Sequence, residues 1–221
     1  GMSIYWFFPP LFALYLLIPF FSQIPESKRK NSFAYGIAII FIVCSCMPLL
    51  LSFLKVPFSM PIIGGGGYCE YLFLGYYITH YDIPQKIRVR VIYPLGIFGL
   101  LLRYVGTLIE SFQLESVGGT FGGYERFPCV VFSAAVFVWF WYHDWSFLNT
   151  GKRKKFLRII SGASFGVYLT HFYILRYLVD TFQIDMQSLQ WRILGIPVVY
   201  LSALFITLLF KRIPGINKLV P

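Results

Sequence analysis

The chain alternates long apolar runs with short polar connections, and this pattern predicts membrane helices. About 20 apolar residues cross the hydrocarbon of a bilayer as an α-helix. We therefore expect an all-α fold, a polytopic transmembrane helical bundle with about seven membrane helices. The apolar runs cover residues 5–21, 33–54, 68–79, 89–109, 127–145, 156–179 and 191–210. The third run is short, since a helix of its length rises only ~18 Å.

The Lys and Arg residues fall in alternate connections, and this predicts an orientation. Basic residues near helix ends are retained on the cytoplasmic side. The connections after the first, third, fifth and seventh runs carry Lys28, Arg29, Lys30, Lys86, Arg88, Arg90, Lys152, Arg153, Lys154, Lys155, Arg158, Lys211, Arg212 and Lys218. We expect a multi-pass protein of the cytoplasmic (inner) membrane, with residue 1 outside and the C-terminus in the cytoplasm. The alternation also requires the short third span.

The composition agrees with a membrane solvent. Hydrophobic residues make up 57% of the chain and charged residues 13%, against about a quarter charged in a soluble domain. The net charge of +10 lies in clusters beside apolar runs, so it indicates topology, and we expect no nucleic-acid partner. No linker or repeat divides the chain, which predicts one membrane domain over residues 1–221. The four cysteines lie in apolar segments, and we interpret them as buried thiols.

Four ionisable residues lie inside apolar runs and are the candidate site residues: Glu70, Arg103, His171 and Arg176. A charge in hydrocarbon costs several kcal/mol unless it is paired or hydrated, so such residues are functional candidates. The expected topology places all four in the outer half of the bilayer, where they would line an outward-facing polar cavity if their faces converge. The alternative is structural ion pairing of Glu70 or Glu110 with Arg103 or Arg176.

His171 has two interpretations. A neutral imidazole can take a proton from a hydroxyl and give it to a leaving group. It can also be a structural hydrogen-bonding residue, with Ser164 or Tyr168 as its partner.

Other polar and small residues have structural interpretations. The pairs His80 with Asp82 and His143 with Asp144 do not supply the three or four convergent ligands of a metal site, and we expect no metal. The glycine-rich stretches 64–67 and 118–123 lack a phosphate-loop ending and are expected to be flexible outer loops. Gly162 and Gly166 form a small-residue face that predicts close helix packing.

Three stretches resemble the acyltransferase 3 family of integral-membrane O-acyltransferases. Residues 160–171, ISGASFGVYLTH, resemble the family's late Ser-Phe-Gly-x-Tyr-Leu-x-His pattern. Residues 5–19 are similar to a helix that opens with Trp-Phe and closes with Tyr-Leu-Leu-x-Pro. Residues 71–77, YLFLGYY, look like the family's Phe-x-x-Gly-Tyr helix. The order and spacing agree with the C-terminal two thirds of the family.

The resemblance implies transfer of an acyl group, acetyl above all, from cytoplasmic acyl-CoA to a hydroxyl of a cell-surface polysaccharide or glycolipid. Acyl-CoA, the glycan acceptor and membrane lipid are then the expected partners, with no bound cofactor. His171 corresponds to the family's late His. Lys86, Arg88, Arg90 and Lys152 would attract the donor's phosphates, although positive-inside topology also explains them.

The resemblance also predicts that this is a partial acyltransferase domain. Family members usually have roughly ten membrane helices, and the first carries a basic residue and a His central to acyl transfer. Neither has a counterpart here, and Gly1 before Met2 suggests an incomplete beginning. Two alternatives to an active enzyme follow: a transporter or flippase-like protein whose buried charges form a polar pathway, and a catalytically inactive fragment.

Overall fold

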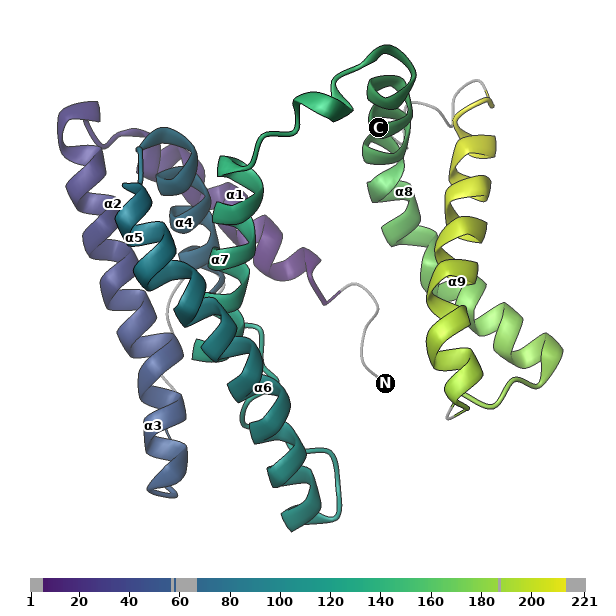
Figure 1. Cartoon of the computed structure of the whole chain (residues 1–221), viewed down its shortest axis with the longest axis horizontal. Coiled ribbons are helices and arrows are strands. Elements are labelled where there is room, and N and C mark those ends of the chain that lie inside the picture. The colour runs from purple at the N-terminus through teal and green to yellow at the C-terminus, as the bar shows by residue number, and fades with distance from the viewer. Residues whose placement is uncertain (1–5, 57, 59–66, 187, 214–221) are drawn as a thin grey trace. The chain divides into compact units, whose positions relative to one another are not determined.

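The fold is all-helical, as the sequence predicts. In the computed structural model, the described residues are 6–56, 58, 67–186 and 188–213, and they contain helices and no strand (Figure 1). In chain order they form α1 (Phe8–Ser22), α2 (Glu26–Ile40), η1 (Phe41–Cys46), α3 (Met47–Phe53), α4 (Tyr68–His80), α5 (Gln85–Ile87), η2 (Arg88–Ile92), α6 (Tyr93–Leu114), α7 (Phe127–Tyr142), η3 (Ser146–Leu148), α8 (Gly151–Phe182) and α9 (Leu189–Phe210).

Each predicted apolar run is helical over most of its length. Helices α2, η1 and α3 are continuous, as are α5, η2 and α6. Three segments of the described chain are long and apolar enough to cross a membrane: Glu26–Phe53, Gln85–Leu114 and Leu189–Phe210. Helices α1 and α7 are apolar but shorter, and α4 closely follows the predicted third run. A membrane-spanning protein is therefore confirmed, while the count of seven spans stays a prediction.

The chain forms two compact units, Gly1–His143 and Asp144–Pro221. The first unit contains α1 to α7, and the second contains η3, α8 and α9. The single membrane domain expected from the sequence stays a prediction.

Two short π-helical segments interrupt the long helices of the first unit. These are η1 and η2, and each is followed two residues later by a proline, Pro48 and Pro94. Proline has no N–H and cannot continue the α-helical hydrogen bonding, so the wider turn lies where that pattern is broken. Such turns occur frequently at functional sites. Ser45 of η1 is fully buried.

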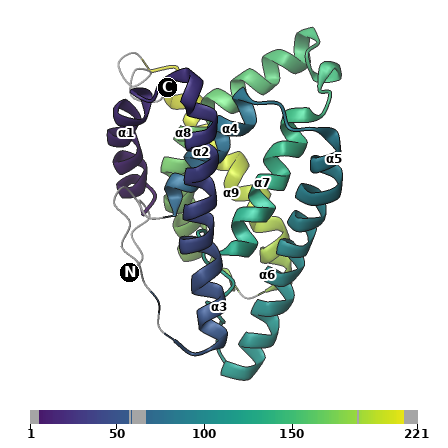
Figure 2. The ribbon, with the colours of Figure 1, turned by 90° about the vertical axis from the view of Figure 1, so that its left-hand side faces the viewer.

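Helices α6 and α7 pack closely through glycine (Figure 2). Gly96 and Gly99 of α6 are buried and face α7. A Cβ atom at Gly99 would lie 2.7 Å from the carbonyl oxygen of Pro128, which is backbone and cannot swing away. The absence of a side chain at Gly99 therefore sets how near the two helices approach.

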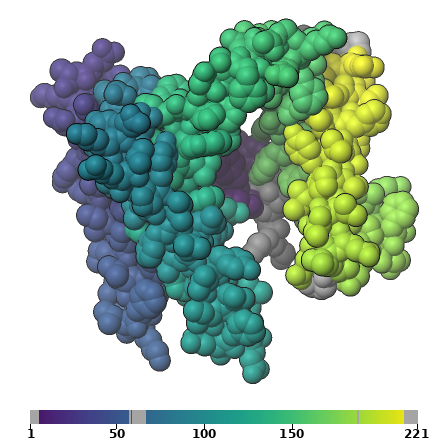
Figure 3. All heavy atoms as spheres, viewed as in Figure 1, coloured from purple at the N-terminus to yellow at the C-terminus, as the bar shows by residue number. Residues whose placement is uncertain are grey.

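The second unit is a pair of antiparallel helices, as the ribbon of Figure 1 shows, and the atoms of α9 lie against those of α8 (Figure 3). Its buried residues on α9 recur at intervals of four: Gly195, Val199, Ala203 and Thr207. On α8 the buried residues are Ala163, Gly166 and Val167. The predicted packing face is thus correct at Gly166 but wrong at Gly162, which is exposed and accepts a hydrogen bond from Lys211 Nζ at 2.6 Å.

A pair of glycine substitutions tests the packing of α6. Gly99→Ala should lower the free energy of unfolding by about 1–3 kcal/mol, because the new methyl group overpacks the contact with Pro128. Gly75→Ala of α4 is the matched control, since a Cβ there meets nothing within 4 Å. It should stabilise the helix by up to about 1 kcal/mol. Unfolding of both variants in detergent measures the difference, and equal effects would contradict the close approach.

The orientation is tested by cysteine labelling in a background without the native cysteines. Lys28→Cys and Lys152→Cys should both be protected from a membrane-impermeant thiol reagent applied from outside, because both positions are expected in the cytoplasm. Val117→Cys is the control, since Val117 is 90% exposed in a connection expected outside. Labelling of Lys28→Cys and Lys152→Cys from opposite faces would refute the topology.

Candidate functional site

A buried polar cluster joins three elements of the first unit. Ser45 Oγ of η1 lies 3.0 Å from Glu70 Oε2 at the start of α4 and 2.6 Å from the carbonyl oxygen of Glu125, just before α7. Glu70 has 0% of its surface exposed, as has Ser45. The predicted intramembrane acid is therefore a truly buried group, and its partner is a hydroxyl.

The hydrogen bonds of Ser45 constrain the protonation of Glu70. A serine hydroxyl has one proton to donate, and the carbonyl of Glu125 can only accept one. If Ser45 donates along the shorter contact to Glu125, the contact with Glu70 is a hydrogen bond only when Glu70 Oε2 carries a proton and donates it to Ser45 Oγ. A neutral carboxyl group also avoids the cost of a buried unpaired charge.

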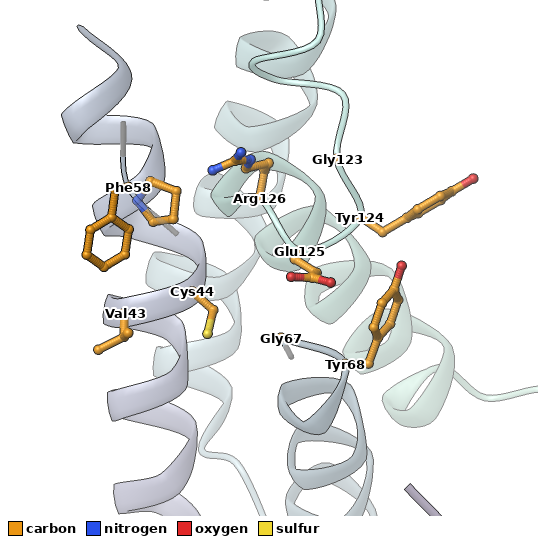
Figure 4. A pocket seen from close by; sticks show the side chains of 10 residues that line it. Val43, Cys44, Phe58, Gly67, Tyr68, Gly123, Tyr124, Glu125 and Arg126 are labelled. Carbon is orange, nitrogen blue, oxygen red and sulfur yellow. The ribbon is translucent and has the colours of Figure 1, made fainter. Parts of the chain in front are cut away.

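One pocket of the first unit has a mixed polar and aromatic lining (Figure 4). Its volume is about 390 Å³. Val43 and Cys44 line one side, while Tyr124, Glu125 and Arg126 come from the connection before α7. Tyr68 lines the pocket together with Tyr124, and we call it the tyrosine pocket. The Trp6 ring stacks on the Tyr124 ring, with the ring centroids 5.0 Å apart. Its polar groups suit a hydroxylated ligand.

A second pocket of the first unit is almost wholly apolar and follows α4. Its volume is about 410 Å³. Glu70 and Asp82 both line it, and they lie at opposite ends of α4, with Leu74 and Ile78 between them. We call it the α4 pocket. The pocket therefore extends from the buried carboxyl group of Glu70 to Pro84 and Ile87, in the stretch of chain that carries the predicted donor-binding cations.

Arg88, the first residue of η2, is positioned by an aromatic ring of α7. The guanidinium of Arg88 lies 3.7 Å from the centroid of the Tyr142 ring. The Tyr142 hydroxyl donates to Asp82 Oδ1 at 3.1 Å and accepts from the backbone N–H of Ile83 at 2.6 Å. Lys86 and Arg90 are exposed. The three predicted cations thus lie in the same stretch of chain as Pro84 and Ile87, which line one end of the α4 pocket.

Arg103 and Glu110 of α6 organise the glycine-rich connection that follows this helix. Arg103 donates to the carbonyl oxygen of Gly122 at 3.1 Å. Glu110 accepts from the backbone N–H of Thr120 at 3.1 Å and from its hydroxyl at 2.5 Å. The stretch 118–123, expected to be a flexible loop, is therefore tied to α6. Its counterpart 64–67 lies outside the described residues except for Gly67.

These contacts answer part of the ion-pair alternative. Among the described residues of the first unit, neither Glu70 nor Glu110 forms an ion pair with Arg103. Arg103 is held by a carbonyl oxygen, and both acids are held by hydroxyl groups. The convergence of Glu70, Arg103, His171 and Arg176 in one cavity stays a prediction.

His171 lies on an open pocket of about 560 Å³ in the second unit. Its Nδ1 is 2.7 Å from the carbonyl oxygen of Tyr168 and 3.2 Å from that of Val167. Carbonyl oxygens only accept hydrogen bonds, so Nδ1 carries the hydrogen, and the lone pair of a neutral ring lies on Nε2. The expected partnership with Tyr168 exists through its backbone carbonyl, and this bond fixes the orientation of the ring.

Arg176 does not line the His171 pocket in the described chain. Its side chain is 72% exposed, and it forms an ion pair with Asp180 at 3.8 Å. Sequence reasoning missed the residues that do line the pocket from α9, among them Trp191, Arg192 and Tyr200. The sequence gives little indication of these residues, because Arg192 has the position of an ordinary cation in an outer connection.

The remaining candidates are dispersed. Lys152 is exposed in the first turn of α8. Cys69 and Cys129 are buried as expected, whereas Cys44 and Cys46 are only partly buried. Across the described residues, no three His, Cys, Asp or Glu side chains form a group able to hold a metal ion.

These features define a polytopic helical membrane protein with polar groups set into apolar helices. A model of the acyltransferase domain family, the acyltransferase 3 type, matches residues 1–212. The chain therefore belongs to the acyltransferase 3 family, which confirms the resemblance found in the sequence. No curated protein and no solved structure matches the chain significantly.

Substitution of Ser45 tests the buried cluster. Ser45→Ala should lower the free energy of unfolding by about 1–3 kcal/mol, because it leaves the Glu125 carbonyl and the Glu70 carboxyl without their shared partner. Ser52→Ala is the matched control, since the Ser52 hydroxyl bonds only the carbonyl of Leu49 in its own helix. Unfolding in detergent checks both variants. A similar small effect of the two would show that the cluster adds no stability.

Proposed function

We propose that this protein is a membrane acyltransferase that moves an acyl group, represented by acetyl, from acyl-CoA to a hydroxyl of a cell-surface polysaccharide or glycolipid. Membership of the acyltransferase 3 family carries the reaction class. The donor, the acceptor and a place in the cytoplasmic membrane, with the C-terminus inside, are parts of the proposal.

The orientation of His171 is the observation that supports a chemical role. Its Nδ1–H is fixed by the carbonyl of Tyr168, so Nε2 is the atom able to accept a proton. The open pocket of the second unit gives a ligand room beside the ring. A base with a fixed tautomer and an adjoining cavity is what general acid–base catalysis requires.

The proposed reaction needs no redox cofactor or metal. His171 Nε2 takes the proton of the acceptor hydroxyl while that oxygen attacks the thioester carbonyl carbon. The new C–O bond forms, the C–S bond breaks, and the departing sulfur receives the proton from His171. An ester and free CoA thiol result, so atoms and charge balance.

The cations of the first unit support a cytoplasmic donor. Lys86, Arg88 and Arg90 lie in the continuous helical segments α5 and η2, and Arg88 is positioned by Tyr142. Cationic side chains bind phosphate through charge-assisted hydrogen bonds. The tyrosine pocket of the same unit offers aromatic faces with Glu125 and Arg126, which suit a sugar.

Acyl transfer is tested with membranes from cells that express the complete gene product. Acetyl-CoA and a surface glycan are supplied, and free thiol and glycan ester are both measured. His171→Ala should reduce turnover by about 10²–10⁴-fold, because the general base is lost. His143→Gln is the control, since His143 is exposed and lies outside the His171 pocket.

Two results would contradict the proposal. Turnover unaffected by His171→Ala would remove His171 from the reaction. Movement of a labelled glycolipid across the membrane without ester formation would favour the transporter or flippase-like alternative.

A further inference from the structure

The α4 pocket contains one polar atom with an unmet hydrogen bond. Glu70 Oε1 is buried and has no hydrogen-bond partner among the described residues. The carboxyl group lines the α4 pocket, whose wall is otherwise apolar apart from Asp82 and Tyr77. A buried acceptor without a donor costs free energy, and in native proteins such a group calls for an explanation.

The proton count at Ser45 identifies the chemistry that this atom needs. If Ser45 donates to the Glu125 carbonyl along the shorter contact, Glu70 carries a proton on Oε2 and is neutral, and Oε1 remains a hydrogen-bond acceptor. The matching ligand group is an amide N–H or a hydroxyl on an otherwise apolar chain. A cationic ligand is disfavoured, because a neutral acceptor does not compensate its charge.

The opposite end of the pocket indicates what such a chain is attached to. Pro84 and Ile87 line the pocket, and Lys86, Arg88 and Arg90 lie in the same stretch of chain. Nε of Arg88 is buried and has no partner among the described residues. Asp82 lies there too, but it accepts the Tyr142 hydroxyl. The balance of charge at this end favours an anionic group such as phosphate.

We propose that the α4 pocket binds the pantetheine arm of the acyl donor, with an amide N–H of the arm donating to Glu70 Oε1 and its phosphates on the helical segment Lys86–Arg90. The inference rests on the acyl-CoA donor of the proposed function and assigns that donor a site. The arm combines short alkyl segments with amide and hydroxyl groups, and it ends in phosphate. A plain lipid tail offers Glu70 no donor, so the buried acceptor distinguishes the two.

Binding to the purified chain tests the proposal without any turnover. Calorimetric titrations use CoA, pantetheine as the arm alone, and adenosine 3′,5′-diphosphate as the phosphate end alone. We expect CoA to bind more tightly than either fragment, because it occupies both parts of the site. Failure of CoA and pantetheine to bind the folded chain would overturn the proposal.

Two substitutions of Glu70 test whether its side chain binds the ligand as a neutral hydrogen-bond acceptor or through a negative charge. Glu70→Gln keeps an oxygen acceptor for the ligand and an N–H donor for Ser45, so CoA and pantetheine should bind within about twofold of the unchanged chain. Glu70→Leu removes the acceptor and should weaken both by about tenfold, equivalent to one hydrogen bond. Binding of adenosine 3′,5′-diphosphate should stay the same. Equal losses in Glu70→Gln and Glu70→Leu would refute the neutral acceptor.

A pair of substitutions in α7 tests the pocket itself and does not depend on Glu70. Ala134 lines the α4 pocket, whereas Val136, two residues away, is exposed and does not line it. Ala134→Phe should fill the pocket and weaken pantetheine by about tenfold or more, while Val136→Phe should leave binding unchanged. Competition by a hydroxylated acyl lipid, with no effect of pantetheine, would assign the pocket to lipid and overturn the proposal.

The two proposals fail separately. Acyl transfer that depends on His171 but is indifferent to Ala134→Phe and Glu70→Leu would leave the proposed function standing and remove the arm site. Pantetheine binding that follows the Glu70 series, in a protein that forms no glycan ester, would keep the pocket and remove the proposed reaction.

Discussion

Hydrocarbon cannot hydrogen-bond, and the structure depends on this property of its solvent. Each backbone group must find a partner within its own helix, so the apolar runs become helices. Each polar side chain inside a run must find a partner in the protein. Glu70 is paired with Ser45, Arg103 with the Gly122 carbonyl, and His171 with the Tyr168 carbonyl. The polar sites of this protein are the places where that requirement is met, or met in part.

Prolines and glycines then decide how the helices pack. Pro48 and Pro94 each follow a π-helical segment, and the first of these segments carries Ser45 to the buried cluster. Gly99 lets α6 approach the backbone of α7. The α4 pocket is lined in part by α6, which carries Gly99, and the His171 pocket is lined in part by α9, which carries the buried Gly195.

Two of these sites present an oriented polar group, Glu70 against Ser45 and His171 against the Tyr168 carbonyl. Ser45 has one proton and lies within hydrogen-bonding distance of two oxygen atoms, so donation to the Glu125 carbonyl requires Glu70 to carry a proton. A histidine whose Nδ1–H is bound to a carbonyl keeps its Nε2 lone pair for another partner. Neutral groups of this kind are stable in an apolar protein and can still exchange protons or accept hydrogen bonds from a substrate.

The sequence by itself determined the helices, the membrane and the family. Hydropathy and helix length are local properties, so runs such as 68–79 could be read directly, and the motif that ends at His171 is contiguous. The interaction partners of the polar side chains could not be predicted in this way. That Glu70 meets a serine and not an arginine, that Arg176 lies exposed beside Asp180, and that Arg192 joins the His171 pocket depend on how distant helices are rotated and spaced. Only tertiary packing fixes these rotations, because a one-residue change turns a helix face by about 100°.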